Sequence, residues 1–70
     1  MIISKEQIKR LKDLLTEDEY NEIISCVNED DIEKFQDLLN DCIVMRFVGD
    51  DPTKEAWAVQ RIYDEVYNQN

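Results

Sequence analysis

Two complete helix-start signals constrain this chain more than any other feature of its sequence. Ser4 with Gln7 forms one capping box, and Thr16 with Glu19 repeats it twelve residues later. In this motif the Ser or Thr side chain accepts a hydrogen bond from the third helical residue, whose own side chain accepts one from the cap residue. The repetition predicts two helices joined by a tight turn.

Two weaker starts and the apolar spacing extend this pattern along the chain. Asp30 with Glu33 resembles a third box, and Asp51-Pro52-Thr53 provides a fourth start with Asp51 or Thr53 as the N-cap. Gly49 stands where a helix end needs a left-handed residue. Apolar residues recur at helical spacing between these points. We expect an all-α fold, a single domain over residues 1–70 built as a small bundle of about four short helices, at approximately 5–15, 17–28, 31–47 and 53–67.

A chain of 70 residues has little apolar area with which to stabilise a bundle. It buries only about 60% of the surface that its unfolded form exposes, so association with a partner or a second copy fits this size. Helical geometry offsets Cys26 and Cys42 by about 12 Å, whereas bridged α-carbons lie within about 7 Å of each other. We expect two reduced, buried thiols.

The residues that metal sites and catalytic sites need are scarce. Histidine is absent, and two cysteines fall short of the four Cys or His ligands of a structural zinc site. The carboxylate runs 17–19 and 29–31 lack the alternating ligands and central glycine of a calcium loop. A cysteine nucleophile would have no histidine base. We expect no metal, no cofactor, no catalytic residue and no enzymatic activity.

No targeting or membrane signal is visible in the hydropathy pattern. The segment 1–5 has no basic stretch followed by an apolar one, as a secretory signal would. The longest apolar run is interrupted by Arg46 and is far shorter than the ~20 residues needed to cross a bilayer. We expect a cytosolic protein.

Negative charge is concentrated in one part of the chain. Residues 13–33 contain nine carboxylates and no Lys or Arg, and the remainder has eight acids and eight bases, so this stretch accounts for the formal net charge of −9. Such a field repels nucleic acid and favours a basic protein surface. The carboxylates are Asp13, Glu17, Asp18, Glu19, Glu22, Glu29, Asp30, Asp31 and Glu33.

Part of this charge falls on one face of the expected second helix. Asp18, Glu22 and Glu29 lie along one stripe, with Ser25 in the gap. Carboxylates one turn apart are ~5–6 Å from each other, close to the ~7 Å between phosphates along a DNA strand that winds as it rises about 3.4 Å per pair. One interpretation is imitation of a phosphate backbone. The other is a solvated face that keeps a small protein soluble.

The segment 42–48 does not fit a regular helix. On a helical wheel Arg46 falls in the middle of the apolar face, while Val44 and Val48 fall on the polar face. In one interpretation the helix ends early and this segment packs irregularly. In the other, Arg46 neutralises the terminal carbonyls, and Val44, Met45 and Val48 form an exposed apolar patch for association.

Trp57 also lies outside the pattern. It is roughly 140° from the centre of the apolar face of its helix, at about 100° per residue, and Arg61 one turn on could stack on its indole. In one interpretation Trp57 covers the helix ends as peripheral core. In the other it is an interface anchor, because Trp and Arg are over-represented among binding hot spots.

The expected first helix carries the opposite charge. Lys5, Lys9 and Lys12 form a basic stripe, with Arg10 beside it. The stripe either pairs with acids on a neighbouring helix or contacts the acidic patch of a second copy in a charge-complementary homodimer. It is too small for direct binding of nucleic acid against the overall field.

Residues 51–67 read Asp-Pro-Thr-Lys-Glu-Ala-Trp-Ala-Val-Gln-Arg-Ile-Tyr-Asp-Glu-Val-Tyr. This segment, a quarter of the chain, resembles C-terminal stretches of small phage and prophage proteins of Gram-positive bacteria. In those stretches a Pro-Thr pair precedes a helix that ends in a Gln-Arg-Ile-Tyr-Asp-Glu-like run. The resemblance carries no catalytic residues. It implies a comparison with small acidic phage proteins that bind and inhibit host or defence proteins, including DNA mimics and anti-CRISPR proteins.

The charge, the outlying residues and the resemblance together predict a non-enzymatic, acidic protein-binding module. We expect a phage-type inhibitor in the host cytosol that mimics nucleic acid and blocks a basic site on a host or defence protein, without itself contacting nucleic acid or membrane. The alternative is an assembly module, a homo-oligomer held by residues 44–48 and the apolar surface of the C-terminal helix. The expected partner-binding residues are Asp18, Glu19, Glu22, Glu29, Asp30, Asp31, Glu33, Val44, Val48, Trp57 and Arg61.

Overall fold

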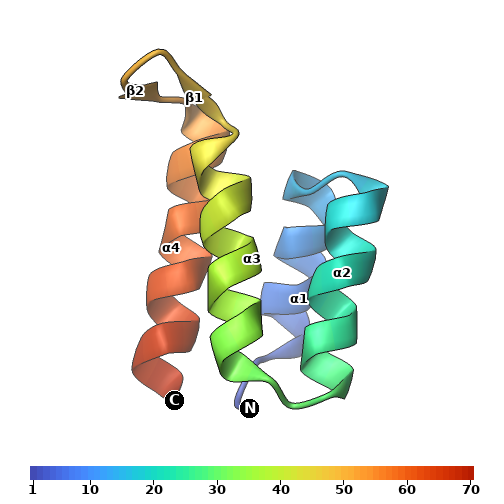
Figure 1. Cartoon of the computed structure of the whole chain (residues 1–70). Helices are drawn as coiled ribbons and strands as arrows, with labels where there is room; N and C mark the ends of the chain where they lie inside the picture. The colour runs from blue at the N-terminus through green and yellow to red at the C-terminus, as the bar shows by residue number, and fades with distance from the viewer.

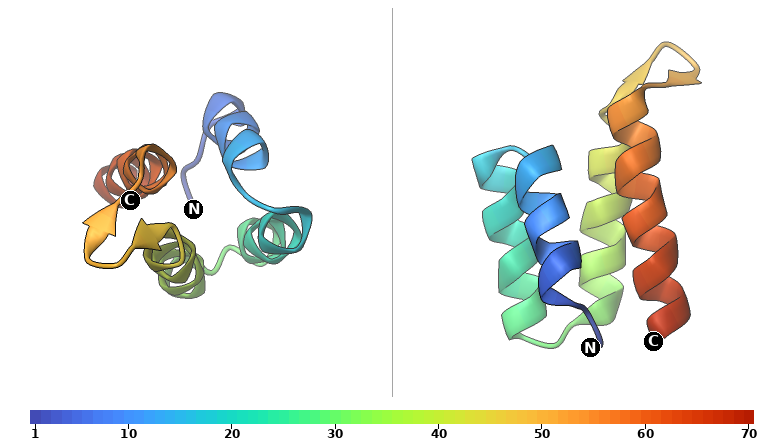
Figure 2. Two further views of the ribbon diagram at one scale, coloured as in Figure 1. Left: turned by 90° about the horizontal axis from the view of Figure 1, so that it is seen from above. Right: turned by 180° about the vertical axis from the view of Figure 1, so that it is seen from behind.

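Four helices surround a shared core, and a small hairpin joins the last two. In chain order the elements are α1 (Lys5–Leu14), α2 (Glu17–Asn28), α3 (Ile32–Val44), β1 (Phe47–Val48), β2 (Asp51–Pro52) and α4 (Lys54–Gln69). The computed structural model describes residues 1–70, and consecutive helices run in opposite directions (Figure 1). Seen from above, α1 neighbours both α2 and α4, and α3 neighbours α2 and α4 (Figure 2). The small all-α bundle expected from the sequence is confirmed.

Both complete capping boxes form as the sequence predicts. The backbone N–H of Gln7 donates to Ser4 Oγ at 3.1 Å, and the N–H of Ser4 donates to Gln7 Oε1 at 3.0 Å. The corresponding distances for Glu19 and Thr16 are 3.2 and 2.9 Å. Thr53 is the N-cap of α4. These four-residue motifs form correctly because all their partners lie within one helical turn.

The expected third capping box, Asp30 with Glu33, is wrong by one residue. The N-cap of α3 is Asp31, whose Oδ1 accepts from the N–H of Lys34 at 3.1 Å, so α3 begins at Ile32. Asp30 instead has a φ of 57°, the left-handed conformation that closes the end of α2. A short polar side chain such as Asp tolerates this conformation better than most residues.

The expected helix over 31–47 is also wrong at its end, because α3 stops at Val44. Phe47 and Val48 pair with Pro52 and Asp51 in an antiparallel hairpin, a conformation that aromatic and β-branched residues favour. Gly49 does take a left-handed φ of 64°, but at the first position of the hairpin turn rather than at a helix end.

Apolar side chains from all four helices meet in a small core. Only 13 of the 70 residues are buried, which leaves a chain of this size little stability to spare. The apolar members are Leu11, Leu15, Ile23, Cys26, Phe35, Leu39, Cys42, Ile43, Ala56, Val59, Ile62 and Val66.

Both thiols belong to this core and are free, in agreement with the expected buried cysteines. Burial raises the pKa of Cys26. Burial and the neighbouring Glu19 carboxylate raise the pKa of Cys42 to about 12. Neither cysteine therefore has the low thiol pKa of a reactive nucleophile.

Arg46 joins all four helices at the hairpin end of the bundle. Its Nη2 and Nη1 donate to Oε1 and Oε2 of Glu19 at 2.6 and 2.9 Å. The same nitrogens donate to the carbonyl oxygens of Leu14 at 3.0 Å and Cys42 at 2.8 Å, near the C-terminal ends of α1 and α3. The Arg46 carbonyl accepts from the Thr53 hydroxyl at 2.6 Å, at the start of α4. We call these contacts the Arg46 junction.

The Arg46 junction is largely shielded from water. The side chains of Arg46 and Glu19 are only 15% and 17% exposed. Hydrogen bonds from Arg46 lower the pKa of Glu19 to about 2, and the hydrogen bond to Glu19 raises the pKa of Arg46. Both interpretations of the segment 42–48 are thus partly correct, since the helix ends early and Arg46 also neutralises terminal carbonyls.

A second polar network aligns α1 with α4. Gln7 is only 5% exposed, and its Nε2 donates to Oε1 of Glu65 at 3.0 Å and to Oε1 of Gln69 at 2.7 Å. Arg10 Nη1 also donates to Glu65 Oε1, at 3.0 Å. These bonds from Gln7 and Arg10 lower the pKa of Glu65. The network lets a buried amide and a carboxylate satisfy each other between the two helices.

Replacing Arg46 with Ala should lower the free energy of unfolding by about 3 kcal/mol, because the change leaves the shielded Glu19 carboxylate without its partner. Urea denaturation followed by circular dichroism measures the loss. Arg61→Ala is the matched control: it removes an exposed arginine and should change the unfolding free energy by less than about 0.5 kcal/mol. Equal losses in the two variants would contradict the Arg46 junction.

The low pKa of Glu19 predicts a specific sensitivity to acid. Because this pKa is about 2 in the folded protein against an ordinary 4.5, the charged carboxylate stabilises the fold above pH 4.5, and this contribution disappears as the pH falls to about 2. The measurement is the difference in unfolding free energy between the native chain and Glu19→Gln, which retains a capping-box residue. We expect about 2 kcal/mol at neutral pH, shrinking toward zero in acid. A difference that does not vary with pH would refute the assignment.

Candidate protein-binding surface

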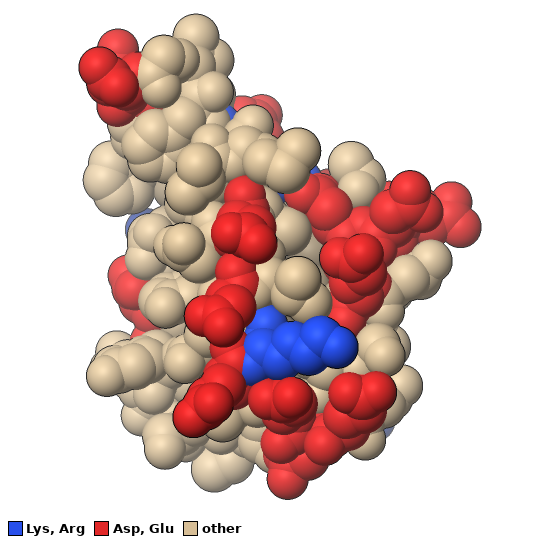
Figure 3. All heavy atoms as spheres, viewed as in Figure 1, with Lys and Arg blue, Asp and Glu red and all other residues tan.

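Exposed carboxylates dominate the face that α2 and α3 form together, which we call the acidic face. Lys34 is the only Lys or Arg between Glu17 and Val44. Figure 3 shows this face, with acidic side chains gathered around a central basic patch. The acidic face consists of Asp18, Glu22, Glu29, Asp30, Asp31, Glu33, Asp37 and Asp41, whereas Glu17 borders a hollow with Lys12 and Tyr20 on the α1 side of α2.

Two helical rows give the acidic face its geometry. The α2 row consists of Asp18, Glu22 and Glu29, as the sequence predicted. The α3 row consists of Glu33, Asp37 and Asp41. The sequence-based prediction ended at Glu33 and missed Asp37 and Asp41 as contact residues, although their four-residue spacing from Glu33 places them on the same helical stripe. Because α2 and α3 are antiparallel neighbours, the two rows lie side by side.

Three of the predicted contact residues are engaged within the protein itself. Glu19 pairs with Arg46 and is only 17% exposed, so its carboxylate does not extend the acidic face. Asp30 forms an ion pair with the Met1 amino group, and Asp31 caps α3, although both remain exposed. The acids of the two rows form no ion pair within the protein. They are the predicted contact residues Asp18, Glu22, Glu29 and Glu33, together with Asp37 and Asp41 of the α3 row.

The α3 row leads into an uncharged group at the hairpin end. Val44 lies three residues beyond Asp41 on the same helical stripe and is 59% exposed. Met45 and Val48 are 78% and 72% exposed. We call Val44, Met45 and Val48 the apolar end. The predicted contact residues Val44 and Val48 are thus brought to one end of the α3 row, as an association patch would require.

Trp57 is exposed and lies on the α3–α4 side of the bundle rather than on the acidic face. Its side chain is 64% exposed, which excludes the interpretation of Trp57 as peripheral core. It lines a pocket of about 150 Å³ with residues from the end of α3, the hairpin and α4, and with none from α2. We call this the hairpin pocket. Arg61 is also exposed, and it borders a shallower hollow beside Trp57 along α4.

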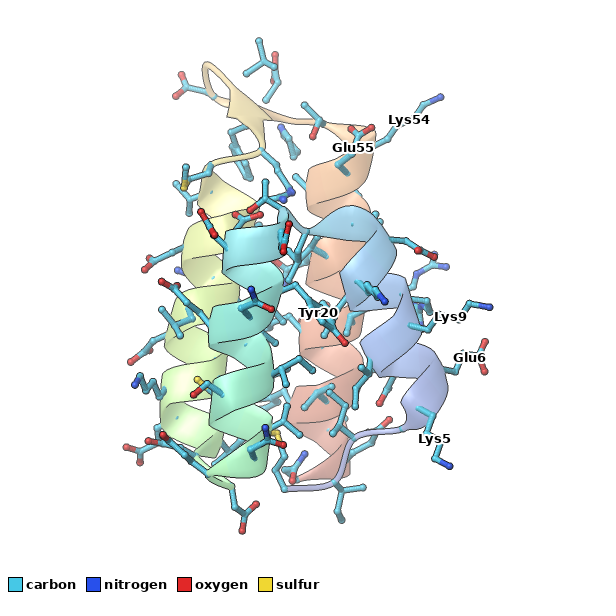
Figure 4. The ribbon with its side chains drawn as sticks, turned by 90° about the vertical axis from the view of Figure 1, so that its right-hand side faces the viewer. Lys5, Glu6, Lys9, Tyr20, Lys54 and Glu55 are labelled. Carbon is cyan, nitrogen blue, oxygen red and sulfur yellow. The ribbon has the colours of Figure 1, made fainter.

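The lysines of α1 point away from the bundle. Lys5 and Lys9 point outward from α1 (Figure 4), and Lys12 is also exposed. None of these lysines forms an ion pair, whereas Arg10 pairs with Glu65 of α4. The predicted pairing of the basic stripe with a neighbouring helix therefore holds for Arg10 alone, and its contact with a second copy stays a prediction.

The structure brings no three His, Cys, Asp or Glu side chains into an arrangement that could hold a metal ion. No helix is both long and apolar enough to span a bilayer. Comparisons with protein-family models, curated proteins and solved structures found no match to this chain. The function therefore has to be argued from the charge and shape of the surface.

Neutralising acids in the middle or last turn of a helix should stabilise the isolated protein. Glu22→Gln, Glu29→Gln and Asp41→Asn together should raise the unfolding free energy by about 1 kcal/mol, because like charges one turn apart repel and late-helix acids oppose the dipole. The gain should shrink in high salt.

Asp18→Asn with Glu33→Gln is the control, since both acids lie in first helical turns. There the favourable dipole interaction offsets the repulsion, and we expect no gain. Urea denaturation at low and high salt measures both variants. Equal stability of the native chain and the neutralised variant at low salt would show that the acidic rows do not repel appreciably.

Proposed function

We propose that this chain is a non-enzymatic binding protein whose acidic face engages a basic surface on another protein. The observation that carries this proposal is the pair of exposed carboxylate rows on α2 and α3, accompanied by a single lysine. Ordinary protein surfaces mix both signs. Clustering one sign raises self-repulsion in a protein with a small core, so a role in binding accounts for it better than solubility alone.

The spacing of the rows supports imitation of a nucleic acid. Within a row, carboxylates one turn apart are ~5–6 Å from each other. The rows stand on neighbouring helices, so they present two adjacent lines of negative charge, as the two strands of a duplex do. A basic surface built to hold two phosphate strands would find a comparable arrangement of charge here.

The proposed role is that of a phage-type inhibitor acting in the host cytosol, which the resemblance of residues 51–67 to phage proteins also favours. Charge steers the protein to the basic site at long range. The apolar end then loses water on contact and slows dissociation. The inhibitor blocks the site by occupying it, without catalysis.

Exposure of the apolar end favours a second candidate function. Val44, Met45 and Val48 are uncharged and exposed, and they would be buried if the chain formed a homo-oligomer for assembly. Light scattering over a range of concentrations separates the candidates. A mass that stays near 8.4 kDa favours the inhibitor, whereas a stable dimer insensitive to charge reversal favours assembly.

Reversing the α2 row with Asp18→Lys, Glu22→Lys and Glu29→Lys should abolish capture of basic nucleic-acid-binding proteins from a bacterial lysate. The control reverses Glu6, Asp13 and Glu55, which are exposed acids outside the acidic face and away from the hairpin pocket. Each substitution changes the charge by two, so both variants carry −3 instead of −9. Glu19 is left unchanged because its reversal would disrupt the Arg46 junction.

Affinity capture with mass spectrometry gives the readout, and circular dichroism confirms that both variants remain helical. The native protein and the control should retain the partner, and duplex DNA should compete for it. Raised salt should slow association. Capture that survives reversal of the α2 row, or a partner that DNA fails to displace, would refute mimicry.

A further inference from the structure

The hairpin presents apolar side chains to solvent at one end of the bundle. Helices α3 and α4 are antiparallel neighbours, which a short loop can connect. The chain instead forms two strands, in which Phe47 is 40% exposed and Val48 is 72% exposed. Apolar side chains that stay exposed gain little from folding. The hairpin is better explained by the pocket that it encloses.

The hairpin pocket has the size and lining of a socket for one side chain. Its volume is about 150 Å³, and its lining residues are Ile43, Phe47, Pro52, Ala56, Trp57 and Gln60. Sites for drug-sized ligands span about 300–1,000 Å³, so this pocket is smaller than a typical site of that kind. Two aromatic residues, Phe47 and Trp57, are among the pocket walls and still face solvent, as do the anchor-receiving residues of many protein interfaces.

Charge near the pocket limits which molecule can supply that side chain. Asp50 and Asp51 are exposed on the hairpin, and Asp64 accepts a hydrogen bond from the pocket residue Gln60 at 2.9 Å. Lys54 and Arg61 are the exposed bases of α4. The net charge of −9 disfavours a second copy, a nucleic acid and an anionic membrane surface, and it favours a cationic polypeptide.

We propose that the hairpin pocket receives one bulky aliphatic or aromatic side chain from the basic partner, in a segment where Lys or Arg stands beside that residue. That the partner is basic rests on the proposed function. That it inserts one apolar side chain into the hairpin pocket is a further claim. Successive strand residues point to opposite faces, so β1 presents Phe47 to the pocket and Val48 to the apolar end. Because both features lie at the hairpin end of the bundle, a partner segment that wraps around this end can contact the apolar end and also fill the pocket.

Selection of short peptides from a random library displayed on phage, with the native protein as bait, tests the anchor. Enriched peptides should share one Leu, Ile, Met, Phe or Trp beside Lys or Arg. Replacing that residue with Ala should weaken binding at least about tenfold. Trp57 is the only tryptophan, so its emission should move to shorter wavelength with the selected peptide and stay unchanged with the Ala peptide. No enriched peptide, or peptides without a shared apolar residue, would overturn the proposal.

Variants of the pocket give an independent result, with fluorescence anisotropy of the labelled peptide as the readout. Phe47→Ala and Trp57→Ala should each weaken binding at least about tenfold. Tyr67→Ala is the matched control, since Tyr67 is an α4 aromatic that is 62% exposed, against 64% for Trp57, and lies outside the pocket. Equal effects of all three would overturn the pocket.

Reversal of the α2 row separates the two proposals. Binding that needs the pocket and survives reversal supports the anchor and counts against the acidic face. Binding that needs the acidic face and survives Phe47→Ala and Trp57→Ala retains the proposed function and overturns the anchor. A dimer whose formation requires Trp57 would identify a second copy as the occupant and also overturn the proposal.

Discussion

The rest of the structure depends on the bidentate pair between Arg46 and Glu19. Arg46 lies after the last turn of α3 and reaches back to the Cys42 carbonyl, so the same side chain that pairs with Glu19 also caps α3. Its contact with Leu14 and its link to Thr53 join the ends of α1 and α4 to the same point. Only 13 residues are buried, so the apolar core is small. The hydrogen bonds of one shielded arginine add contacts between the helix ends that this core does not provide.

The Arg46 junction also shapes the surface. It takes one arginine and one glutamate out of solvent. Arg10 pairs with Glu65, and three lysines are exposed on α1. The acidic face consequently keeps a single base, Lys34. Because α3 ends at Val44, the following residues are available to form the hairpin. Two of them, Phe47 and Pro52, line the hairpin pocket. The Arg46 junction thus withdraws Glu19 from the acidic face and lies beside the segment that forms the hairpin.

Sequence reasoning succeeded where the partners lie within a turn of each other. The boxes of Ser4 and Thr16 and the α2 row depend on contacts between residues three or four apart, which helical periodicity specifies. It failed at Asp30, where closing α2 required a left-handed residue and moved the cap to Asp31. It also failed beyond Val44, where the chain leaves the helix and Arg46 pairs with the distant carboxylate of Glu19. Arg46 and Glu19 are 27 residues apart, beyond the range of any local pattern.

The sequence by itself determined the helical class, the sign of the charge and the placement of Asp18, Glu22 and Glu29 on one stripe, because these follow from composition and from a repeat of 3.6 residues per turn. Only the tertiary structure decided that Glu19 turns inward, that the helix carrying Asp37 and Asp41 packs beside α2, and that Trp57 borders a pocket. Those outcomes depend on which helices become neighbours. That choice is made by burial of apolar faces and by contacts between residues far apart in the chain.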